Sequence, residues 1–472
     1  MTQYDHVVLI SIDTLRADCF GLTPTNLWRD RFGDELPYDS TILDAIAGEG
    51  AFFSKCITAA PYTSASHATF FTGQWPPRHG LYELFNRRLR SATVFADARR
   101  AGYTTHFKVD FPLILGRDLG FLDDVQHSFV EDDDAPLRVV RDSARSFGFV
   151  HFGGVHTPYG FHNLRFGGDD YREKVAELEA ELPGMRRSPV DRLIETQREG
   201  DDLALLIRYK RITQYLYETG AYRRLFELYL EGVQYFMKRR FARFYDHLTS
   251  ALRGRRALIV IFGDHGEDWD AETYGHHNSV AEGVTRVPLL FIGDGIQAAR
   301  YTGRVRSVDL VPTLCALTGI RRRTSADGVS LAETVRSGAQ YVERDAYCQT
   351  YSAETADFVR FQQRQLLHGR KTGSLRHVRY KEAAYHGDLK LARQFFAMSE
   401  AGGIWGLQAC PVVRRLDRID AAGRLHEIAD PGETELDGML DRYNAIIERD
   451  GLRRAPLPLD ELARASARSA LR

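Results

Sequence analysis

Two acidic residues of this chain stand directly after apolar runs of strand length. Asp13 follows "VVLISI", while Asp264 and His265 follow "ALIVIFG". In an open α/β sheet, side chains at the carboxyl ends of parallel strands lie where ligands bind. Two carboxylates and an imidazole suit a divalent cation such as Mn²⁺, Mg²⁺, Ca²⁺ or Zn²⁺. In the alternative interpretation, Asp13 caps a helix and Asp264 and His265 are ordinary loop residues.

Thr63 lies at the start of a predicted helix in the stretch "PYTSASHATFFTG". Helix N-termini favour anions, because their first N–H groups are free and the helix dipole is positive there. Beside a cation held by Asp13, Asp264 and His265, the Thr63 hydroxyl could be ionised and attack a tetrahedral ester. A Ser/Thr run before apolar residues is also an ordinary helix cap, which is the competing explanation.

Histidines fall in two further loop segments. His156 follows a predicted strand in "FVHFGGVHTPYG", and His276 and His277 precede one in "TYGHHNSVAEGVTRVPLLF". A single loop histidine is most often solvated. Their joint placement near strand ends makes these three histidines candidates for the site.

Short apolar runs recur along the chain and predict strands over residues 6–12, 104–109, 147–152, 256–262 and 287–292. Helical patterns such as "TILDAIAGEG" and "SVDLVPTLCALTGI" lie between them. Strands that are apolar on both faces and alternate with helices indicate an α/β fold, with a mostly parallel sheet covered by helices.

The domain organisation follows from changes in this pattern. Residues 1–340 are predicted to form the main α/β domain, with a charged, aromatic-rich helical insertion at about 168–255. The Leu, Tyr and Phe residues of the insertion have the spacing of a packing stripe. Its Lys238-Arg239-Arg240 run predicts a solvated face. Residues 341–472 are predicted to form a smaller C-terminal α+β domain, in which "VVRRLDRIDAAGRLHEIADPGETE" contains a hairpin.

Composition excludes several classes of function. The 63 Lys and Arg residues balance 64 Asp and Glu residues, so no overall charge would attract nucleic acid or an anionic membrane. The five cysteines are scattered, without C-x-x-C spacing, which argues against a disulfide framework or a structural zinc site. The N-terminus shows no signal-peptide pattern and no run is long enough for a membrane span, so we expect a cytoplasmic protein.

The motifs together resemble the sulfatase-like branch of the alkaline phosphatase superfamily. "VVLISIDTLRADCFG" is similar to the family's first metal-binding strand, and "TSASHATFFTGQWPPRHG" to its nucleophile signature. "FVHFGGVHTPYG", "VIFGDHGED" and "GHHNSVAEGVTRVPLLF" resemble later family segments in the same order. The resemblance spans residue 7 to about 435. It implies the sulfatase-like α/β fold and metal-dependent hydrolysis or transfer of an anionic small-molecule ester.

The resemblance also implies roles for individual residues. It makes Asp13, Asp264, His265 and Thr63 ligands of one divalent cation, with Thr63 also the nucleophile. His156, with His276 or His277, would contact the ester oxygens or protonate the leaving group; the motif spacing slightly favours His276. We assign substrate binding to His67, Lys108 and Asn86.

Several positions depart from the family pattern. Thr14 replaces the second Asp of the sulfatase Asp-Asp pair, Ala65 and His67 replace the Pro and Arg of the nucleophile signature, and the usual downstream Lys falls near Asp110, two residues from Lys108. The anion pocket is therefore not that of a standard arylsulfatase.

The nucleophile position departs most. Sulfatases oxidise a Cys or Ser there to formylglycine, whose gem-diol eliminates sulfate, and threonine cannot form that aldehyde. A sulfated threonine cannot eliminate sulfate in this way, whereas a phosphorylated threonine can be attacked at phosphorus by water or another acceptor. The sequence therefore favours phosphate or phosphonate esters. The alternatives are a sulfatase working without formylglycine and a catalytically silent anion-binding scaffold. The helices of 168–255 are expected to cover the site or to join two copies of the chain.

Overall fold

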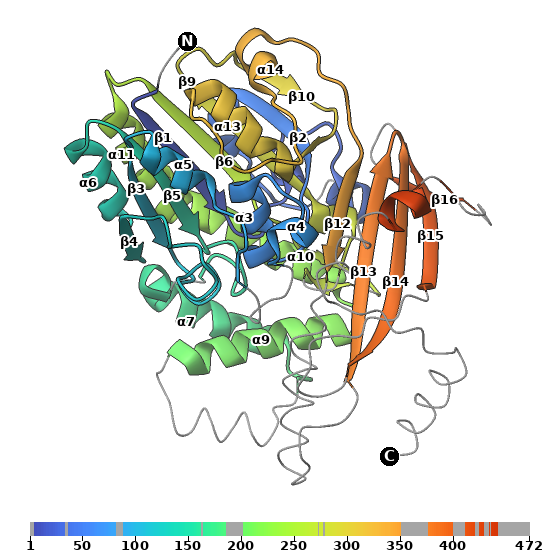
Figure 1. Cartoon of the computed structure of the whole chain (residues 1–472). Helices are drawn as coiled ribbons and strands as arrows, with labels where there is room; N and C mark the ends of the chain where they lie inside the picture. The colour runs from blue at the N-terminus through green and yellow to red at the C-terminus, as the bar shows by residue number, and fades with distance from the viewer. Residues whose placement is uncertain are drawn as a thin grey trace.

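A nine-stranded sheet forms the centre of the molecule (Figure 1). The computed structural model describes residues 4–33, 36–81, 88–161, 164–185, 202–271, 273–276, 279–350, 376–399, 411–420, 424–428, 434 and 436–441. The strand order is β10-β2-β9-β6-β1-β5-β3-β4, and β11 pairs with β2. The strands are β1 (His6–Ile12), β2 (Ala51–Ile57), β3 (Thr104–Val109), β4 (His127–Val130), β5 (Ser146–Phe152), β6 (Ala257–Gly263), β9 (Arg286–Gly293), β10 (Ala299–Tyr301) and β11 (Val305–Arg306).

The predicted α/β fold is confirmed, and each of the five predicted strands is present, as β1, β3, β5, β6 and β9. Strand β1 lies between β5 and β6 and is parallel to both. Strand β9 runs antiparallel to its neighbours β2 and β6, so the sheet is mixed on this side. The site-bearing strands β1, β5 and β6 therefore end at the same edge.

Helices cover both faces of the sheet, because β1 is apolar on both. Val7 and Leu9 pack into one core with α3 (Thr63–Thr72), α5 (Val94–Arg100), α13 (Leu310–Thr318) and α14 (Ala332–Ser337). Val8 and Ile10 pack into the other core with α1 (Leu27–Phe32), α2 (Thr41–Ala47), α6 (Asp134–Asp142) and the helices described next. The short helices α4 (Pro76–His79) and α12 (Glu282–Thr285) lie in connections between strands.

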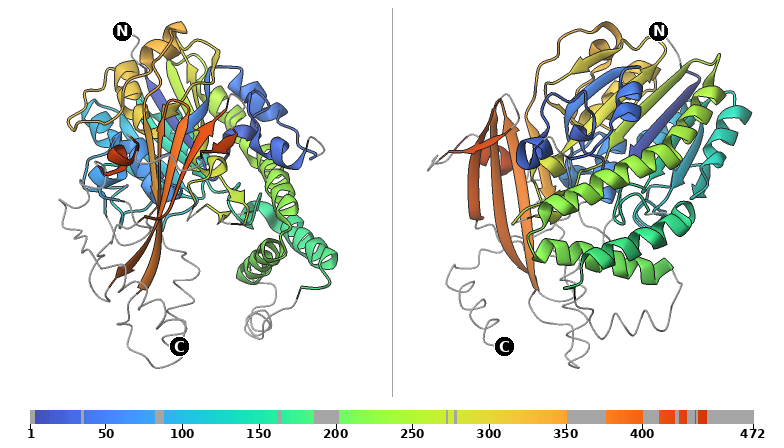
Figure 2. Two further views of the ribbon diagram at one scale, coloured as in Figure 1. Left: turned by 90° about the vertical axis from the view of Figure 1, so that its right-hand side faces the viewer. Right: turned by 180° about the vertical axis from the view of Figure 1, so that it is seen from behind.

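The predicted helical region folds as α7 (Leu164–Glu181), α9 (Asp202–Glu218), α10 (Tyr222–Phe236), a π-helical turn (Met237–Phe241) and α11 (Ala242–Leu252). From α10 to α11 the helix is continuous and runs along the rear of the sheet (Figure 2, right). Its aromatic and aliphatic residues form the predicted packing stripe in the core. The prediction that residues 238–240 form a solvated face is wrong for Arg240, because its side chain is buried and ion-paired. A contact with a second copy stays a prediction.

A separate antiparallel sheet forms the C-terminal part of the described chain. Its strands are β12 (Ala346–Thr350), β13 (Arg376–His386), β14 (Leu389–Ser399), β15 (Pro411–Ile419) and β16 (Leu425–Glu427). The antiparallel β15–β16 pair is the hairpin that the sequence predicts. A two-stranded ribbon, β7 (Asp268–Trp269) with β8 (Tyr274–Gly275), lies next to the loop that carries Asp264. The exact domain division at residue 340 stays a prediction.

Two further expectations concern thiols and membranes. Among the described residues, Cys19, Cys56, Cys315 and Cys348 are free. Cys410 lies outside the described residues. None of the helices in the described ranges combines the length and apolarity needed to cross a bilayer.

Candidate metal and nucleophile site

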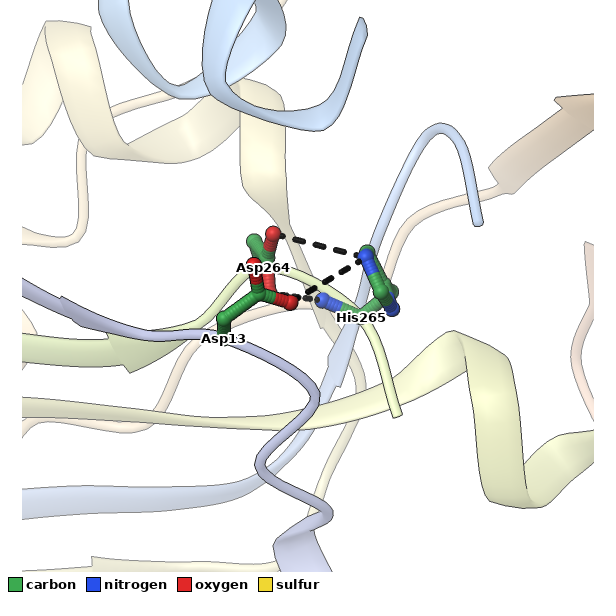
Figure 3. Close-up of side chains that lie close together, drawn as sticks. All are labelled: Asp13, Asp264 and His265. Carbon is green, nitrogen blue, oxygen red and sulfur yellow. Dashed lines mark hydrogen bonds and ion pairs between the residues drawn. The ribbon is translucent and has the colours of Figure 1, made fainter. Parts of the chain in front are cut away.

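Asp13, Asp264 and His265 meet at the carboxyl edge of the central sheet (Figure 3). The parallel register pairs Ile12 at the end of β1 with Gly263 at the end of β6, so the residues that follow lie side by side. One ligand atom from each of the three lies within 4.8 Å of the others, and all three are buried. This separation is far below the roughly 8 Å that would exclude a shared cation, since direct ligands sit about 2.0–2.6 Å from a metal.

Atoms that suit a cation lie on one side of this cluster. Asp13 Oδ1 and Asp264 Oδ2 are buried and accept no hydrogen bond from the described residues. His265 Nδ1 donates to the Gly266 carbonyl at 3.1 Å, which leaves the Nε2 lone pair facing Asp13 Oδ1 at 3.6 Å and Asp264 Oδ2 at 3.5 Å. A backbone carbonyl on the distal nitrogen is the usual support for a metal-ligating histidine. These residues therefore fit a divalent cation.

The electrostatics of the two carboxyl groups agree with this interpretation. Burial raises the pKa of Asp13 from 3.8 to about 6. Burial, reinforced by the neighbouring Asp13, also raises the pKa of Asp264. Both shifts mean that the ionised forms of these two buried carboxyl groups are unfavourable without a cation. A bound cation would reverse that cost.

The carboxyl group of Asp264 is held on its other side by the main chain. Its Oδ1 accepts the N–H of Thr14 at 3.1 Å and that of His265 at 2.9 Å. Thr14 adopts a φ of 59°, a conformation that is uncommon for threonine. The Tyr229 hydroxyl on α10 donates to the Thr14 carbonyl at 2.8 Å. The helical region therefore supports the backbone turn that aims the Thr14 N–H at Asp264.

Thr63 is the first residue of α3 and reaches the same cluster. Its hydroxyl oxygen lies 3.3 Å from Asp13 Oδ2 and 3.4 Å from His265 Nε2. The first helical hydrogen bond of α3 runs from the Ser66 N–H to the Tyr62 carbonyl at 3.1 Å, so the three preceding N–H groups lie ahead of the helical ladder. The Thr63 hydroxyl, a potential nucleophile, thus lies at the N-terminus of α3, where free N–H groups attract anions.

His67, predicted to bind substrate, lies behind Thr63 and is fully buried. Its Nδ1 donates to the Thr63 carbonyl at 2.7 Å, and its Nε2 accepts from the Ser11 hydroxyl at 2.8 Å. Burial lowers the pKa of His67 to about 3, so the ring is neutral. With both nitrogens in use, this geometry favours a role in positioning the first turn of α3 over direct substrate contact.

Lys108, also predicted to bind substrate, is buried in an ion-pair network. Its three ammonium donors lie 2.5 Å from Asp110, 2.8 Å from Asp133 and 3.0 Å from the His151 carbonyl. Arg240, from the π-helical turn, pairs with both of these aspartates. Burial alone would raise the pKa of Asp110, but Lys108 and Arg240 hold it well below its usual value. Lys108 therefore links the ends of β3 and β5. All three of its N–H donors are used by these contacts, so none is left for a substrate.

The candidate acid histidines lie against the metal cluster. The His276 ring stacks on His265 with centroids 4.2 Å apart, and His156 lies edge-on to His276 at 5.4 Å. His276 Nδ1 contacts Glu267 Oε1 at 3.0 Å. His277 and Asn86 lie outside the described residues, so their assignments stay predictions.

Four residues of this region were not singled out from the sequence as site residues: His151, Glu267, Asp133 and Arg240. His151 Nε2 lies 3.3 Å from Asp13 Oδ2. The sequence did carry a signal for His151. It lies on the same face of the strand as the apolar Phe147 and Phe149, so a polar side chain follows two apolar ones near the end of the strand. Arg240 had no such signal, since its aspartate partners are more than 100 residues away in the chain.

Comparison with known proteins agrees with this fold. The Sulfatase family model matches residues 5–113 and 139–320, which is more than half of the chain. The chain belongs to the sulfatase family. A phosphonate monoester hydrolase of Agrobacterium radiobacter has a similar structure, with a TM-score of 0.54 and 16% identity over 84% of this chain and 89% of that one.

Two curated relatives match parts of the chain. A Δ4,5-hexuronate-2-O-sulfatase of Bacteroides thetaiotaomicron is 35% identical over 98 residues, or 20% of each protein. The low-salt glycan biosynthesis sulfotransferase Agl7 of Haloferax volcanii is 25% identical over 319 residues, or 64% of this chain and 63% of that protein. The chain thus covers less than two thirds of the length of either relative.

The raised pKa of Asp13 predicts how metal-free stability depends on pH. The folded state binds this proton more tightly than the unfolded state, so the stabilisation is complete below about pH 4 and is lost as pH rises through 6. Asp13→Asn removes this dependence. Relative to the wild type, the variant should gain about 2–3 kcal/mol in unfolding free energy between pH 4 and 7. Urea unfolding of chelator-treated proteins measures it, and a pH-independent difference would contradict the prediction.

Proposed function

We propose that the protein is a metal-dependent hydrolase or transferase of phosphate or phosphonate esters, with Thr63 as an unmodified nucleophile. The observation that carries this proposal is the position of the Thr63 hydroxyl, 3.3 Å from Asp13 Oδ2 and 3.4 Å from His265 Nε2, at the N-terminus of α3. A hydroxyl nucleophile suits phosphoryl transfer, because a phospho-threonine can be cleaved by a second attack at phosphorus.

Asp13, Asp264 and His265 would hold the cation. When bound, it supplies Lewis-acid stabilisation of the charge on a nonbridging ester oxygen and favours the ionised hydroxyl. In the first step the Thr63 oxygen bonds to phosphorus as the bond to the leaving oxygen breaks. The hydroxyl proton is directed toward Asp13 Oδ2, which accepts its hydrogen bond. In the second step water or another acceptor attacks phosphorus, and Thr63 regains a proton.

The leaving oxygen needs a proton when its conjugate acid is weak. His156 and His276 lie on the His265 side of the cluster. Glu267 contacts Nδ1 of His276, which supports a fixed ring orientation with Nε2 on the opposite side. We assign protonation of the leaving group to His156, assisted by His276.

His156→Ala should therefore slow esters with poor leaving groups more than activated ones. General acid catalysis contributes about 10²–10⁴-fold where the leaving group needs a proton, and little where it does not. Steady-state turnover of an alkyl phosphate and of 4-nitrophenyl phosphate by the same variant measures the ratio. Equal losses on both substrates would mean that His156 binds the ester and does not protonate it.

Sulfuryl transfer is the second candidate, and the two curated relatives favour it because their names describe a sulfatase and a sulfotransferase. A panel of 4-nitrophenyl phosphate, bis-4-nitrophenyl phosphate, phenylphosphonate and sulfate esters, combined with metal analysis, separates the two. We expect turnover of a phosphorus ester and little of the sulfate esters. Preferential sulfate release would favour the second candidate, and metal binding without turnover of any of these esters would support an anion-binding scaffold.

A further inference from the structure

His151 is a buried histidine that lies beside the candidate metal site and outside its ligand cluster. It is the penultimate residue of β5, and the parallel register places it opposite Ser11 of β1. Its side chain is fully buried, on the α3 side of the sheet together with Phe147 and Phe149. Its Nε2 lies 3.3 Å from Asp13 Oδ2. The cluster of potential ligands contains Asp13, Asp264 and His265, without His151.

The hydrogen bond to Asp13 has one direction. A carboxylate accepts only, so Nε2 of His151 carries the hydrogen and donates. Nδ1 is buried and has no hydrogen-bond partner in the part of the chain that the structure describes. A bare lone pair is less costly there than an unpaired N–H. The charged groups around the ring are Asp13, Asp110, Asp264, Lys108 and Arg240, and burial lowers the pKa of His151 to about 4. The ring is therefore neutral.

The two oxygens of Asp13 have different surroundings. Oδ2 accepts from Thr63 and from His151, whereas Oδ1 accepts nothing and faces Asp264 and His265. When Thr63 gives up its hydrogen to attack an ester, His151 is the side-chain donor to Oδ2 that remains among the described residues. The orientation of Oδ1 toward the cation then depends on His151.

The strand end that carries His151 is itself fixed. The His151 carbonyl accepts from Lys108 at 3.0 Å, and the Gly153 N–H donates to Asp110 at 2.9 Å. Arg240 binds the same aspartate through two N–H groups, at 2.8 and 3.0 Å. The buried ion-pair network thus holds the backbone from which the imidazole reaches Asp13.

We propose that His151 is a positioning residue for the metal site: by donating from Nε2 to Asp13 Oδ2, it orients Oδ1 toward the cation and sets the affinity for the cation without binding it. This inference rests on the metal site of the proposed function. It goes further by assigning affinity to a residue outside the ligand set. Residues that support metal ligands in this way typically change metal affinity about 10–100-fold when replaced.

Paired substitutions at His151 test the donor itself. The amide nitrogen of His151→Gln reaches the place of Nε2, whereas that of His151→Asn lies near Nδ1 and falls short of Asp13. His151→Leu removes all polarity. The matched control is His106→Leu. His106 on β3 is equally buried, neither of its ring nitrogens has a hydrogen-bond partner among the residues that the structure describes, and it lies outside the cluster of potential ligands.

The measurement is calorimetric titration of Mn²⁺ into chelator-treated protein, after circular dichroism has verified folding. His151→Leu and His151→Asn should bind Mn²⁺ about 10–100-fold more weakly, and His151→Gln should stay close to the wild type. His106→Leu should bind as the wild type does. Unchanged affinity in the Asn variant, or equal weakening in the Gln and Asn variants, would overturn the role of His151 while leaving the metal site intact. A wild type that binds no divalent cation would instead overturn the metal site, and the inference with it.

Discussion

Thr63→Ala should abolish turnover of phosphorus esters while the protein remains folded. The substitution removes the one oxygen that the proposal uses as nucleophile. It also leaves Asp13 Oδ2 with the His151 hydrogen bond, so the loss in unfolding free energy should be limited to about 1–3 kcal/mol. Initial rates on the best substrate of the ester panel, together with thermal unfolding, measure both effects.

Thr63→Ser should keep part of the activity, because the attacking oxygen remains and only the methyl group that restricts its rotamer is lost. Ser64→Ala is the matched control. The Ser64 hydroxyl is buried next to Thr63 and has no hydrogen-bond partner within the described ranges. Alanine keeps the backbone N–H. This control should retain wild-type turnover. Full activity in Thr63→Ala would exclude Thr63 as the nucleophile.

Removal of the divalent cation should have a comparably large effect. Without it, the buried carboxylates of Asp13 and Asp264 lie side by side with no cation between them, and the ester loses its Lewis acid. We expect turnover to fall by on the order of 10³-fold or more on chelation and to return when a divalent cation is restored. Asp264→Asn should give a similar loss that added metal rescues poorly, because Asp264 Oδ2 is one of the two unpartnered oxygens.

The control for chelation is the same chelator already saturated with Mn²⁺, which should leave the rate unchanged. Elemental analysis of the treated protein shows whether the metal has been removed. Undiminished turnover in protein shown to be metal-free would contradict the proposed chemistry at this site.

The convergence of Asp13, Asp264 and His265 could be predicted because each follows a buried strand, and parallel strands end at one edge. The order of the strands could not be read in this way. Pairing of β1 with both β5 and β6 joins segments about 140 and 250 residues apart, and local pattern carries no information on such distant neighbours. The antiparallel direction of β9 was missed for the same reason.

The substrate-binding predictions for His67 and Lys108 show a second limit. Both residues occupy motif positions or lie near them, but motif position does not say which way a side chain points. His67 is held by Ser11 and the Thr63 carbonyl. Lys108 is held by aspartates that Arg240 also binds, from a helix far along the chain. Buried ion-pair partners of this kind depend on tertiary packing, so the residue types alone could not identify them.

Attack of the Thr63 oxygen on phosphorus can be observed directly in a rapidly quenched reaction. The enzyme is mixed with its best phosphorus ester, stopped in acid during turnover and digested for mass spectrometry of the peptide containing "PYTSASHATF". We expect a transient phosphoryl or phosphonyl adduct on Thr63 that is absent from Thr63→Ala. An adduct on Ser64 or Ser66 would exclude Thr63 as the nucleophile.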